Sequence, residues 1–313
     1  MKVLITEPLD FGEENLELLR GISEVLKGPF SRTELLKAVE EADVLMIRLG
    51  HVIDKEIIEK ANKLRFILTP TTGLNHVDVN AAEEKGIKVI SLRGETEFLA
   101  GIPSTAEHTW ALLLSLLRKI PAAHNHVTNG YWERDYFKAH NLYHYKLGIL
   151  GFGRVGKQIS EYARVFKMPF VFYDKDYNLK NHPNAVEDLE RFMSEIDVLS
   201  IHIPLNQENT RFLNETNLKY LKSTAYIVNT SRGEVIDETV LADMLIQKKI
   251  SGLATDVLDS ENSAEARGNN PLIKAAKHLD NVIITPHIAG ATYESMWRTE
   301  EFVIRKFRRI SKA

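Results

Sequence analysis

The stretch that decides the fold is LGILGFGRVG, residues 147–156. It begins as an apolar strand, continues into glycines spaced as GxGxxG, and is followed by a helical pattern over residues 157–166. Gly151 would permit a tight turn, Gly153 a close approach of the backbone to a pyrophosphate, and Gly156 close packing of the helix on the strand. A helix N-terminus offers such an anion N–H groups and a favourable dipole. The stretch therefore predicts a dinucleotide-binding unit.

A carboxylate stands at the distance from this motif that dinucleotide-binding units require. After a further predicted strand over residues 170–173 comes Asp174, 18 residues past Gly156 (174 − 156). A carboxylate there is expected to bind the adenosine ribose hydroxyls and to repel a 2′-phosphate. The sequence therefore favours NAD over NADP, a preference that the adjacent Lys175 weakens. The alternative is a glycine-rich turn without a ligand, but strand, helix and acid together favour dinucleotide binding.

Short apolar runs alternate with segments of helical period on both sides of this unit, which is the pattern of parallel sheets covered by helices. The N-terminal part predicts strands over residues 3–6, 44–48, 66–69 and 88–91, with helices over 15–21 and 33–42. The second series predicts strands over residues 147–150, 170–173, 198–201, 225–229 and 282–285, with 253–257 as another candidate, and a helix over 293–310 ends the chain.

We expect the chain to pass between two α/β domains twice, near Gly101 and near His287. We predict an α/β fold of two doubly wound parallel-sheet domains: a Rossmann-type nucleotide-binding domain, residues 101–288, inserted into a flavodoxin-like domain formed by 1–100 and 289–313. Ser104 and Glu107 stand at capping-box spacing ahead of an apolar helix over residues 110–117. Residues 124–145 lack clean periodicity and are interpreted as a connecting excursion.

Composition excludes several classes of function. With 40 basic and 43 acidic residues the formal charge is −3, so no overall basic field exists for nucleic acid or an anionic membrane. The 313 residues contain no cysteine, which excludes disulfides, thiolate nucleophiles and thiolate metal sites. No apolar run of about 20 residues and no secretion signal is present, so a soluble cytoplasmic protein is expected. The histidines of the excursion lack the acidic partners and spacing of a metal site, and no metal is assigned; they are His124, His126, His140 and His144.

Several ordered motifs give the chain, over nearly its whole length, a resemblance to the D-isomer-specific 2-hydroxyacid dehydrogenase family. This family includes phosphoglycerate dehydrogenase and glyoxylate/hydroxypyruvate reductase. The motifs are STAEH at residues 104–108, GFGRVG at 151–156, HIPL at 202–205, VNTSRGEVID at 228–237, Asp256-Val257 with Glu261, and TPHIAG at 285–290.

The resemblance implies a catalytic set of Arg232, Glu261 and His287. A guanidinium can hydrogen-bond both the carboxylate and the carbonyl of a 2-oxo acid in one plane. An imidazole can deliver a proton to the carbonyl oxygen as hydride reaches the carbon, and a carboxylate on its other nitrogen would fix its orientation. Glu265 and Asp259 are alternatives for the role of Glu261, because the segment after it departs from the family pattern.

The resemblance also implies binding residues. Backbone N–H groups of the loop at Thr72, Gly73 and Leu74 would bind the substrate carboxylate, and Arg48 would contact the distal end of the substrate unless it merely ends a strand. Asp256 would hold the nicotinamide carboxamide. The implied cofactor-binding residues are Thr72, Gly151, Gly153, Arg154, Val155, Gly156, Asp174, Ile203, Thr230, Ser231 and Asp256.

The expected activity is transfer of a hydride between NAD and a small D-2-hydroxy or 2-oxo acid. The alternative from another class is a corepressor-like protein that senses NAD(H) on the same fold. A homodimer is expected from the family, with the apolar helix over residues 110–117 as candidate interface material.

Overall fold

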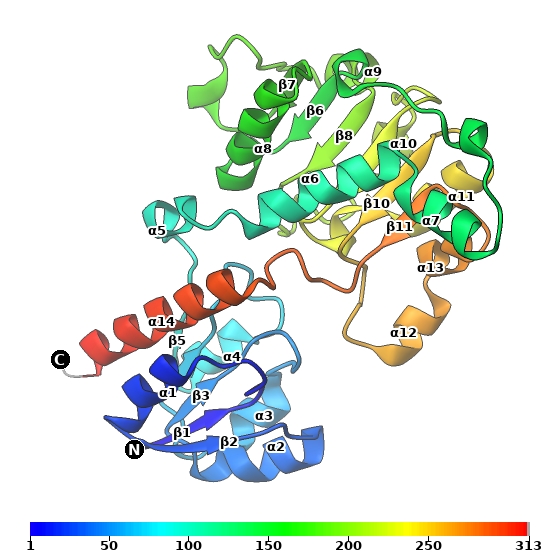
Figure 1. Ribbon diagram of the computed structural model, residues 1–313. Helices are drawn as coiled ribbons and strands as arrows, with labels where there is room; N and C mark the ends of the chain where they lie inside the picture. Colours follow the sequence, from blue (N-terminus) through cyan, green and yellow to red (C-terminus); the bar gives the residue numbers. More distant parts are fainter. Residues whose placement is uncertain (312–313) are drawn as a thin grey trace. The chain divides into compact units, whose positions relative to one another are not determined.

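The chain folds into two α/β units, which a computed structural model describes over residues 1–311 (Figure 1). The first unit comprises Met1–Ile102 and the chain from Ala291 onward, and the second comprises Pro103–Gly290. The boundaries expected from the sequence, after residues 100 and 288, lie two residues before these.

The first unit contains a parallel five-stranded sheet in the order β2-β1-β3-β4-β5. In the register of the central strand, Val3 pairs with Val25 on one side and Val44 on the other. This is the flavodoxin-like strand order, as predicted. The strands are β1 (Lys2–Ile5), β2 (Glu24–Lys27), β3 (Val44–Met46), β4 (Phe66–Leu68) and β5 (Lys88–Ile90). The helices are α1 (Glu13–Arg20), α2 (Arg32–Ala38), α3 (Lys55–Lys60), α4 (Val79–Glu84), α5 (Thr96–Ala100) and α14 (Tyr293–Ile310), with a 3₁₀ turn η1 (Val39–Glu41).

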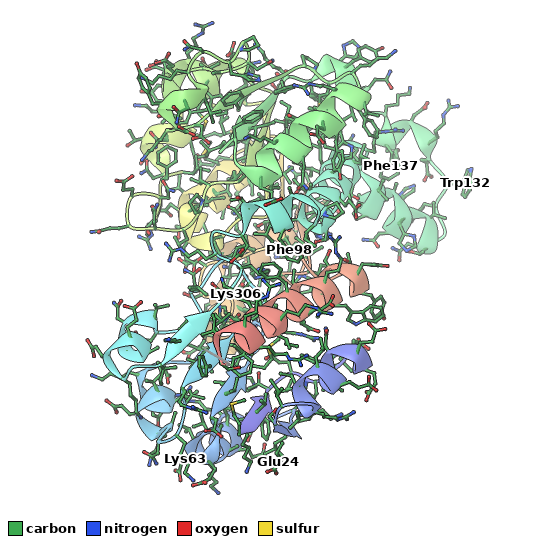
Figure 2. All side chains as sticks on the ribbon, turned by 90° about the vertical axis from the view of Figure 1, so that its left-hand side faces the viewer. Glu24, Lys63, Phe98, Trp132, Phe137 and Lys306 are labelled. Carbon is green, nitrogen blue, oxygen red and sulfur yellow. The ribbon has the colours of Figure 1, made fainter. Side chains whose placement is uncertain are left out.

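Both faces of this sheet are buried, because successive side chains of a strand point to opposite faces. Val3 and Ile5 belong to a core cluster that includes Phe307 of α14, whereas Leu4 belongs to another cluster that includes Leu35. The C-terminal helix α14 is thereby part of the first unit's core. It also reaches α5, where Phe98 stacks on Phe302 at 4.1 Å between ring centroids and Lys306 Nζ pairs with Glu95 Oε1 at 2.6 Å (Figure 2).

The second unit contains a parallel six-stranded sheet in the order β11-β10-β9-β8-β6-β7. The strand order reverses between β6 and β8, and an isolated bridge joins Phe172 of the edge strand β7 to Ala185. The strands are β6 (Leu147–Leu150), β7 (Phe170–Tyr173), β8 (Val198–Ile201), β9 (Tyr226–Asn229), β10 (Gly252–Thr255) and β11 (Val282–Ile284). In an open α/β sheet the reversal point, at the carboxyl ends of the strands, is where ligands bind.

Helices cover both faces of this sheet (Figure 1). One core cluster contains side chains of α6 and α8, and the other contains side chains of α9, α10, α11 and α13. The helices are α6 (Ser104–Leu117), α7 (Ile120–Thr128), α8 (Arg154–Val165), α9 (Leu189–Glu195), α10 (Glu215–Leu218), α11 (Glu238–Ile246), α12 (Ala264–Asn269) and α13 (Pro271–Ala276). The 3₁₀ turns are η2 (Arg134–Phe137), η3 (Leu142–His144), η4 (Tyr177–Leu179) and η5 (Gly233–Val235).

One expectation about α6 is wrong. Its N-cap residue is Pro103, so Ser104 is already helical, and the buried Ser104 hydroxyl has no hydrogen-bond partner among residues 1–311. No capping box forms. The side chains of Trp110, Leu113 and Leu117 are buried in the core of the second unit, whereas Ala111 on the same helix is exposed. The part expected of this helix in a homodimer interface stays a prediction.

Within residues 1–311, no helix combines the length and the apolar composition needed to cross a membrane. The same residues contain no group of three or more His, Cys, Asp or Glu side chains arranged to hold a metal ion.

Candidate active site

The glycine motif forms a tight connection between β6 and α8. Gly151 has φ +94°, a conformation that favours glycine, and a Cβ built there would lie 2.8 Å from the carbonyl carbon of His202. At Gly156 a Cβ would lie 2.2 Å from the Gly151 oxygen, so the helix can approach the strand only with glycine at this position. At Gly153, the N-cap of α8, a Cβ would meet nothing within 4 Å. The loop therefore leaves open space in front of the helix N-terminus, which suits a pyrophosphate.

Asp174 lies beside this loop at the end of β7. Its Oδ2 accepts a hydrogen bond from the Phe152 amide at 2.6 Å, and its Oδ1 accepts one from the Asp176 amide at 2.8 Å. The adjacent Lys175 pairs with Glu208 at 2.9 Å. The Asp174 carboxylate is thus fixed next to the loop, while the neighbouring ammonium is engaged by another acid. Both features suit a ribose diol better than a 2′-phosphate.

A neutral histidine, His202, lies directly against Gly151 of the glycine loop. Burial, and secondarily the charge of Arg154, lower the pKa of His202 to about 3. The ring is therefore uncharged at neutral pH, and its Nε2 hydrogen-bonds the Ser200 hydroxyl at 2.8 Å. Burial also lowers the pKa of Arg154. The sequence placed His202 in a motif but gave no sign of this environment.

Glu261 and His287 form a pair at one end of the second sheet. The Glu261 Oε1 atom contacts His287 Nδ1 in a hydrogen-bonded ion pair, and Glu261 Oε2 accepts a hydrogen bond from the Leu258 amide at 3.1 Å. Burial raises the pKa of Glu261, but the bond to His287, the charge of that ring and the Leu258 amide outweigh it, leaving the pKa below its ordinary value. Of the three acids considered for this role, Glu261 is the one that contacts the ring.

Asp256 holds the turn that carries His287. This turn has a left-handed conformation, with φ +55° at His287. The fully buried Asp256 carboxylate accepts hydrogen bonds from the Ile288 amide at 2.9 Å, the Ala289 amide at 2.7 Å and the Thr285 hydroxyl at 2.5 Å. In addition, the His287 amide donates to the Asp256 carbonyl at 2.8 Å. Asp256, expected as a cofactor contact, is therefore also an anchor for the histidine.

Helix α6 supplies two side chains to the same region. His108 Nε2 lies 3.0 Å from the Thr285 hydroxyl and 3.3 Å from Asp256 Oδ1. The Thr109 hydroxyl lies 2.7 Å from the Thr230 hydroxyl. Sequence reasoning noted His108 only as part of a motif, because its partners lie far along the chain.

Arg232 follows a rigid turn after β9. The Asn229 side chain accepts hydrogen bonds from the Ser231 amide at 3.0 Å and its hydroxyl at 2.8 Å, and donates to the Arg232 carbonyl at 2.9 Å. Burial lowers the pKa of Arg232, while the charges of Glu261 and Glu234 act in the opposite direction. Arg232 and the His287–Glu261 pair thus belong to one electrostatic cluster within the second unit.

Gly233, the residue after Arg232, packs against the turn that carries Glu261. A Cβ at Gly233 would lie 2.0 Å from the Leu258 carbonyl carbon and 2.2 Å from the Asp259 nitrogen. The two backbone segments therefore touch directly, and only glycine permits this approach.

The remaining candidate residues belong to the first unit. Thr72, Gly73 and Leu74 lie in the loop after β4, where the Thr71 hydroxyl donates to the Gly73 carbonyl at 2.8 Å. Arg48 donates to Glu300 through Nε at 2.8 Å, with Glu300 fully buried. It also donates to the Leu9 carbonyl at 2.8 Å. These contacts favour the structural interpretation of Arg48.

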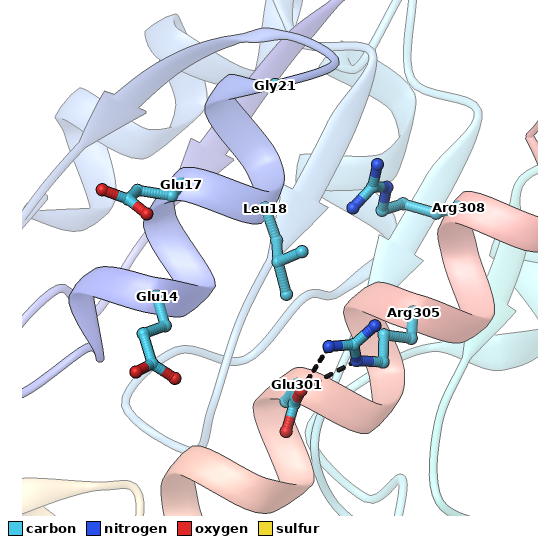
Figure 3. A pocket seen from close by; sticks show the side chains of 7 residues that line it. All are labelled: Glu14, Glu17, Leu18, Gly21, Glu301, Arg305 and Arg308. Atoms are coloured by element: carbon cyan, nitrogen blue, oxygen red, sulfur yellow. Dashed lines mark hydrogen bonds and ion pairs between the residues drawn. The ribbon is translucent and has the colours of Figure 1, made fainter.

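A surface hollow of about 310 Å³ lies between α1 and α14 in the first unit (Figure 3). Its lining combines three glutamates with Arg305 and Arg308, and Arg305 pairs with Glu301 at 2.7 Å. None of the candidate residues lines it, so we assign it no part in the site.

Comparison with known proteins agrees with this geometry. Residues 110–289 match the family model described as D-isomer specific 2-hydroxyacid dehydrogenase, NAD binding domain. The chain is 33% identical to D-3-phosphoglycerate dehydrogenase of Methanocaldococcus jannaschii over 99% of this chain, but it spans only 57% of that relative. It is 31% identical to hydroxypyruvate reductase of Thermotoga maritima over 97% of this chain and 96% of the relative.

A solved structure resembles the whole chain. It is D-lactate dehydrogenase from Aquifex aeolicus, determined in complex with NAD and lactic acid. The two chains are 26% identical and superpose with a TM-score of 0.85, and the match covers 100% of this chain and 96% of the other. Together with the glycine loop, the fixed Asp174 and the match over residues 110–289, these likenesses place the chain in the D-isomer specific 2-hydroxyacid dehydrogenase family.

Proposed function

We propose that this protein is an NAD-dependent oxidoreductase that interconverts a small D-2-hydroxy acid and the corresponding 2-oxo acid. The observation that carries the proposal is the His287–Glu261 pair, which belongs to the same electrostatic cluster as Arg232. An imidazole oriented by a carboxylate and accompanied by a guanidinium is the arrangement that protonation of a substrate carbonyl needs.

Arg232 would orient the 2-oxo acid. Its planar guanidinium has several N–H donors and can bind the substrate carboxylate and carbonyl oxygen together, which the point charge of a lysine cannot do. The rigid turn formed by Asn229 and Ser231 fixes the backbone from which Arg232 projects. Negative charge that develops on the carbonyl oxygen would be stabilised by the same group.

His287 would move the proton. When held by the glycine loop and Asp174, NADH would provide the hydride for the carbonyl carbon, and the carbonyl oxygen would take up the negative charge. His287 then gives the Nε2 proton to this oxygen, and the alcohol and a neutral imidazole result. In the oxidative direction His287 takes the hydroxyl proton. Glu261 holds Nδ1 in both directions and stabilises the charged ring.

The cofactor would be held mainly by the second unit. Gly151, Gly153 and Gly156 shape the loop for the pyrophosphate at the start of α8, and Asp174 would receive the ribose hydroxyls. We assign further cofactor contacts, which these motifs imply, to Thr72, Arg154, Val155, Ile203, Thr230, Ser231 and Asp256. From the first unit, the backbone N–H groups of Thr72, Gly73 and Leu74 would bind the substrate carboxylate.

The experiment that tests this proposal is a panel of glyoxylate, hydroxypyruvate, 3-phosphohydroxypyruvate and pyruvate, each assayed with NADH and with NADPH. We expect oxidation of NADH by at least one acid, with a higher kcat/KM for NADH than for NADPH. The His287→Ala variant serves as the background control.

Tight NADH binding without turnover across the panel would contradict the proposal and support the corepressor-like alternative. That alternative has no support in the relatives reported above, which are named as enzymes. The homodimer and the cytoplasmic location expected from the sequence stay predictions.

A further inference from the structure

Glu238 is a buried carboxylate outside the candidate catalytic set. It is the first residue of α11, and its residue surface is 8% exposed. Its Oε1 accepts a hydrogen bond from the Asp259 amide at 2.9 Å, and its Oε2 accepts one from Asn270 Nδ2 at 2.5 Å. The two donors lie 21 and 32 residues away along the chain, so the carboxylate joins three separate segments.

Neither of the two groups that donate to Glu238 can turn to present an acceptor atom instead. The Asp259 group is a backbone N–H. The Asn270 side-chain oxygen caps α13 by accepting from the Leu272 amide at 2.9 Å and the Ile273 amide at 3.2 Å, so its NH₂ group must face Glu238. Both oxygens of Glu238 therefore meet N–H donors, and only the ionised carboxylate accepts at both positions without placing a proton against a donor.

The segment that Glu238 holds is the turn that carries Glu261. Within this turn Glu261 accepts from the Leu258 amide, and the Gly233 backbone packs closely against Leu258 and Asp259. The turn is therefore fixed between the backbone after Arg232 and the carboxylate at the start of α11.

We propose that Glu238 is a positioning residue for the reaction: its carboxylate fixes the turn over residues 258–261 so that Glu261 meets His287 Nδ1. This inference rests on the proposed function. The hydrogen bonds of Glu238 go to Asp259 and Asn270, which are not members of the proposed catalytic set, so its effect on the reaction passes through the turn.

The ionisation of Glu238 falls in the working range of an enzyme. Its pKa is raised to about 7, mainly by burial and in smaller part by the charges of Asp259 and Glu234, although the bonds from the Asp259 amide and Asn270 act to lower it. Protonation below this pKa places an O–H against one of two N–H donors and weakens the hold on the turn. Activity should therefore fall on the acid side of neutrality through Glu238.

The test compares full-length Glu238→Gln and Glu238→Ala with a matched control, Glu215→Gln. Glu215 is likewise the first residue of a helix, α10, but it is exposed. The readouts are kcat and its pH profile, KM for NADH, and hydrogen exchange of the amides in residues 257–263. Thermal unfolding verifies that each variant is folded.

We expect Glu238→Gln to lower kcat at pH 8 about tenfold, the factor that loss of one charge-assisted hydrogen bond corresponds to. KM for NADH should stay within about twofold, since the glycine loop is not involved. The acid-side fall in kcat should disappear, exchange over residues 258–261 should accelerate, and Glu215→Gln should behave as the wild type. In a Glu261→Gln background, Glu238→Gln should have little further effect on kcat, because both changes act through one group.

An unchanged kcat, pH profile and local exchange in Glu238→Gln would overturn the inference. An equal change of kcat and KM for NADH with faster exchange throughout the second unit would also overturn it, since that result indicates general destabilisation. If the wild type reduces no 2-oxo acid, the proposed function fails by itself. In that case accelerated local exchange would still support the anchoring of the turn, and unchanged exchange would reject it.

Discussion

At the residue scale, Glu261 is the group that connects Arg232 and His287 electrostatically. Glu261 is stabilised as a carboxylate mainly by the His287 ring, and it acts on Arg232 as a counter-charge. Removing one member therefore changes the environment of the other two, and the effects of single substitutions will not add.

We predict that His287→Ala lowers kcat by a factor of about 10² to 10⁴, the usual contribution of a general acid, and leaves the Kd for NADH within about twofold. Arg232→Ala should instead abolish productive binding of the 2-oxo acid, and Arg232→Lys should recover little, because an ammonium cannot bind two oxygens in one plane. Steady-state kinetics and fluorescence titration with NADH check both. The control is His124→Ala, on the exposed face of α7. Near-normal kinetics in both active-site variants would refute the assigned roles.

A second prediction at this scale concerns Asp174. Asp174→Ala should lower the ratio of kcat/KM for NADH to that for NADPH by at least about tenfold, because a ribose acceptor and a repulsive charge are both removed. Asp174 also accepts the Phe152 amide, so Ala will loosen the glycine loop as well. Asp174→Asn separates the two effects better, since its single acceptor oxygen can keep the Phe152 amide, whereas the charge and the acceptor for the Asp176 amide are lost. An unchanged ratio in both variants would show that another residue sets the preference.

At the element scale, the connection after β9 touches the turn after β10 through Gly233. A Cβ at this position would lie 2.0 Å from the Leu258 carbonyl carbon, so one backbone must move. We predict that Gly233→Ala destabilises the protein by about 1–3 kcal/mol, the usual cost of overpacking, and lowers kcat by displacing Glu261 relative to His287. Urea unfolding and steady-state kinetics measure the two effects.

The matched control for Gly233→Ala is Gly268→Ala. Gly268 lies in α12, and a Cβ there would meet nothing within 4 Å. This substitution should be neutral or stabilise by about 0.5–1 kcal/mol, because alanine loses less backbone entropy in a helix. Wild-type stability and kcat in Gly233→Ala would show that the two turns are not mechanically coupled.

The sequence predicted those helices and strands that show a clear pattern within their own few residues. Strands such as β6 and β8 are buried along their whole length, so they appear as continuous apolar runs. By contrast β2, with the sequence Glu24–Lys27 and three exposed residues, pairs with β1 at the sheet edge and has no such signal. The capping box at Ser104 failed because Pro103 already occupies the N-cap, and spacing alone does not reveal where a helix begins.

The same distinction applies to the site. The glycine loop and Asp174 were predictable, because strand, loop, helix and acid follow one another within a short stretch. The supporting side chains were not, since His108 meets Thr285 177 residues later and Glu238 meets Asn270 32 residues later. Such pairs depend on which strands become neighbours, and a single sequence does not state this.

At the scale of the whole molecule, the segment between α6 and β6 exposes a group of aromatic side chains. Trp132 is 84% exposed, Tyr136 71% and Tyr131 57% (Figure 2). Large exposed aromatic side chains gathered in one segment are typical of interaction sites, and aromatic residues are enriched at the centres of interfaces. This aromatic segment is therefore a second candidate for the predicted surface of a homodimer, beside α6.

We predict that Trp132→Asp combined with Tyr136→Asp converts a dimer into a monomer, because burying two carboxylates without partners at an interface costs more than the lost apolar contact. Sedimentation velocity over a range of concentrations measures the change. The control is Tyr177→Asp, since Tyr177 is 76% exposed on η4, outside the aromatic segment. If the double variant remains dimeric, or if the wild type is a monomer at all concentrations, the aromatic segment is not the dimer interface. The proposed catalytic residues Arg232, Glu261 and His287 lie within one chain, so a monomeric variant that keeps its kcat would show that dimerisation is not needed for the chemistry.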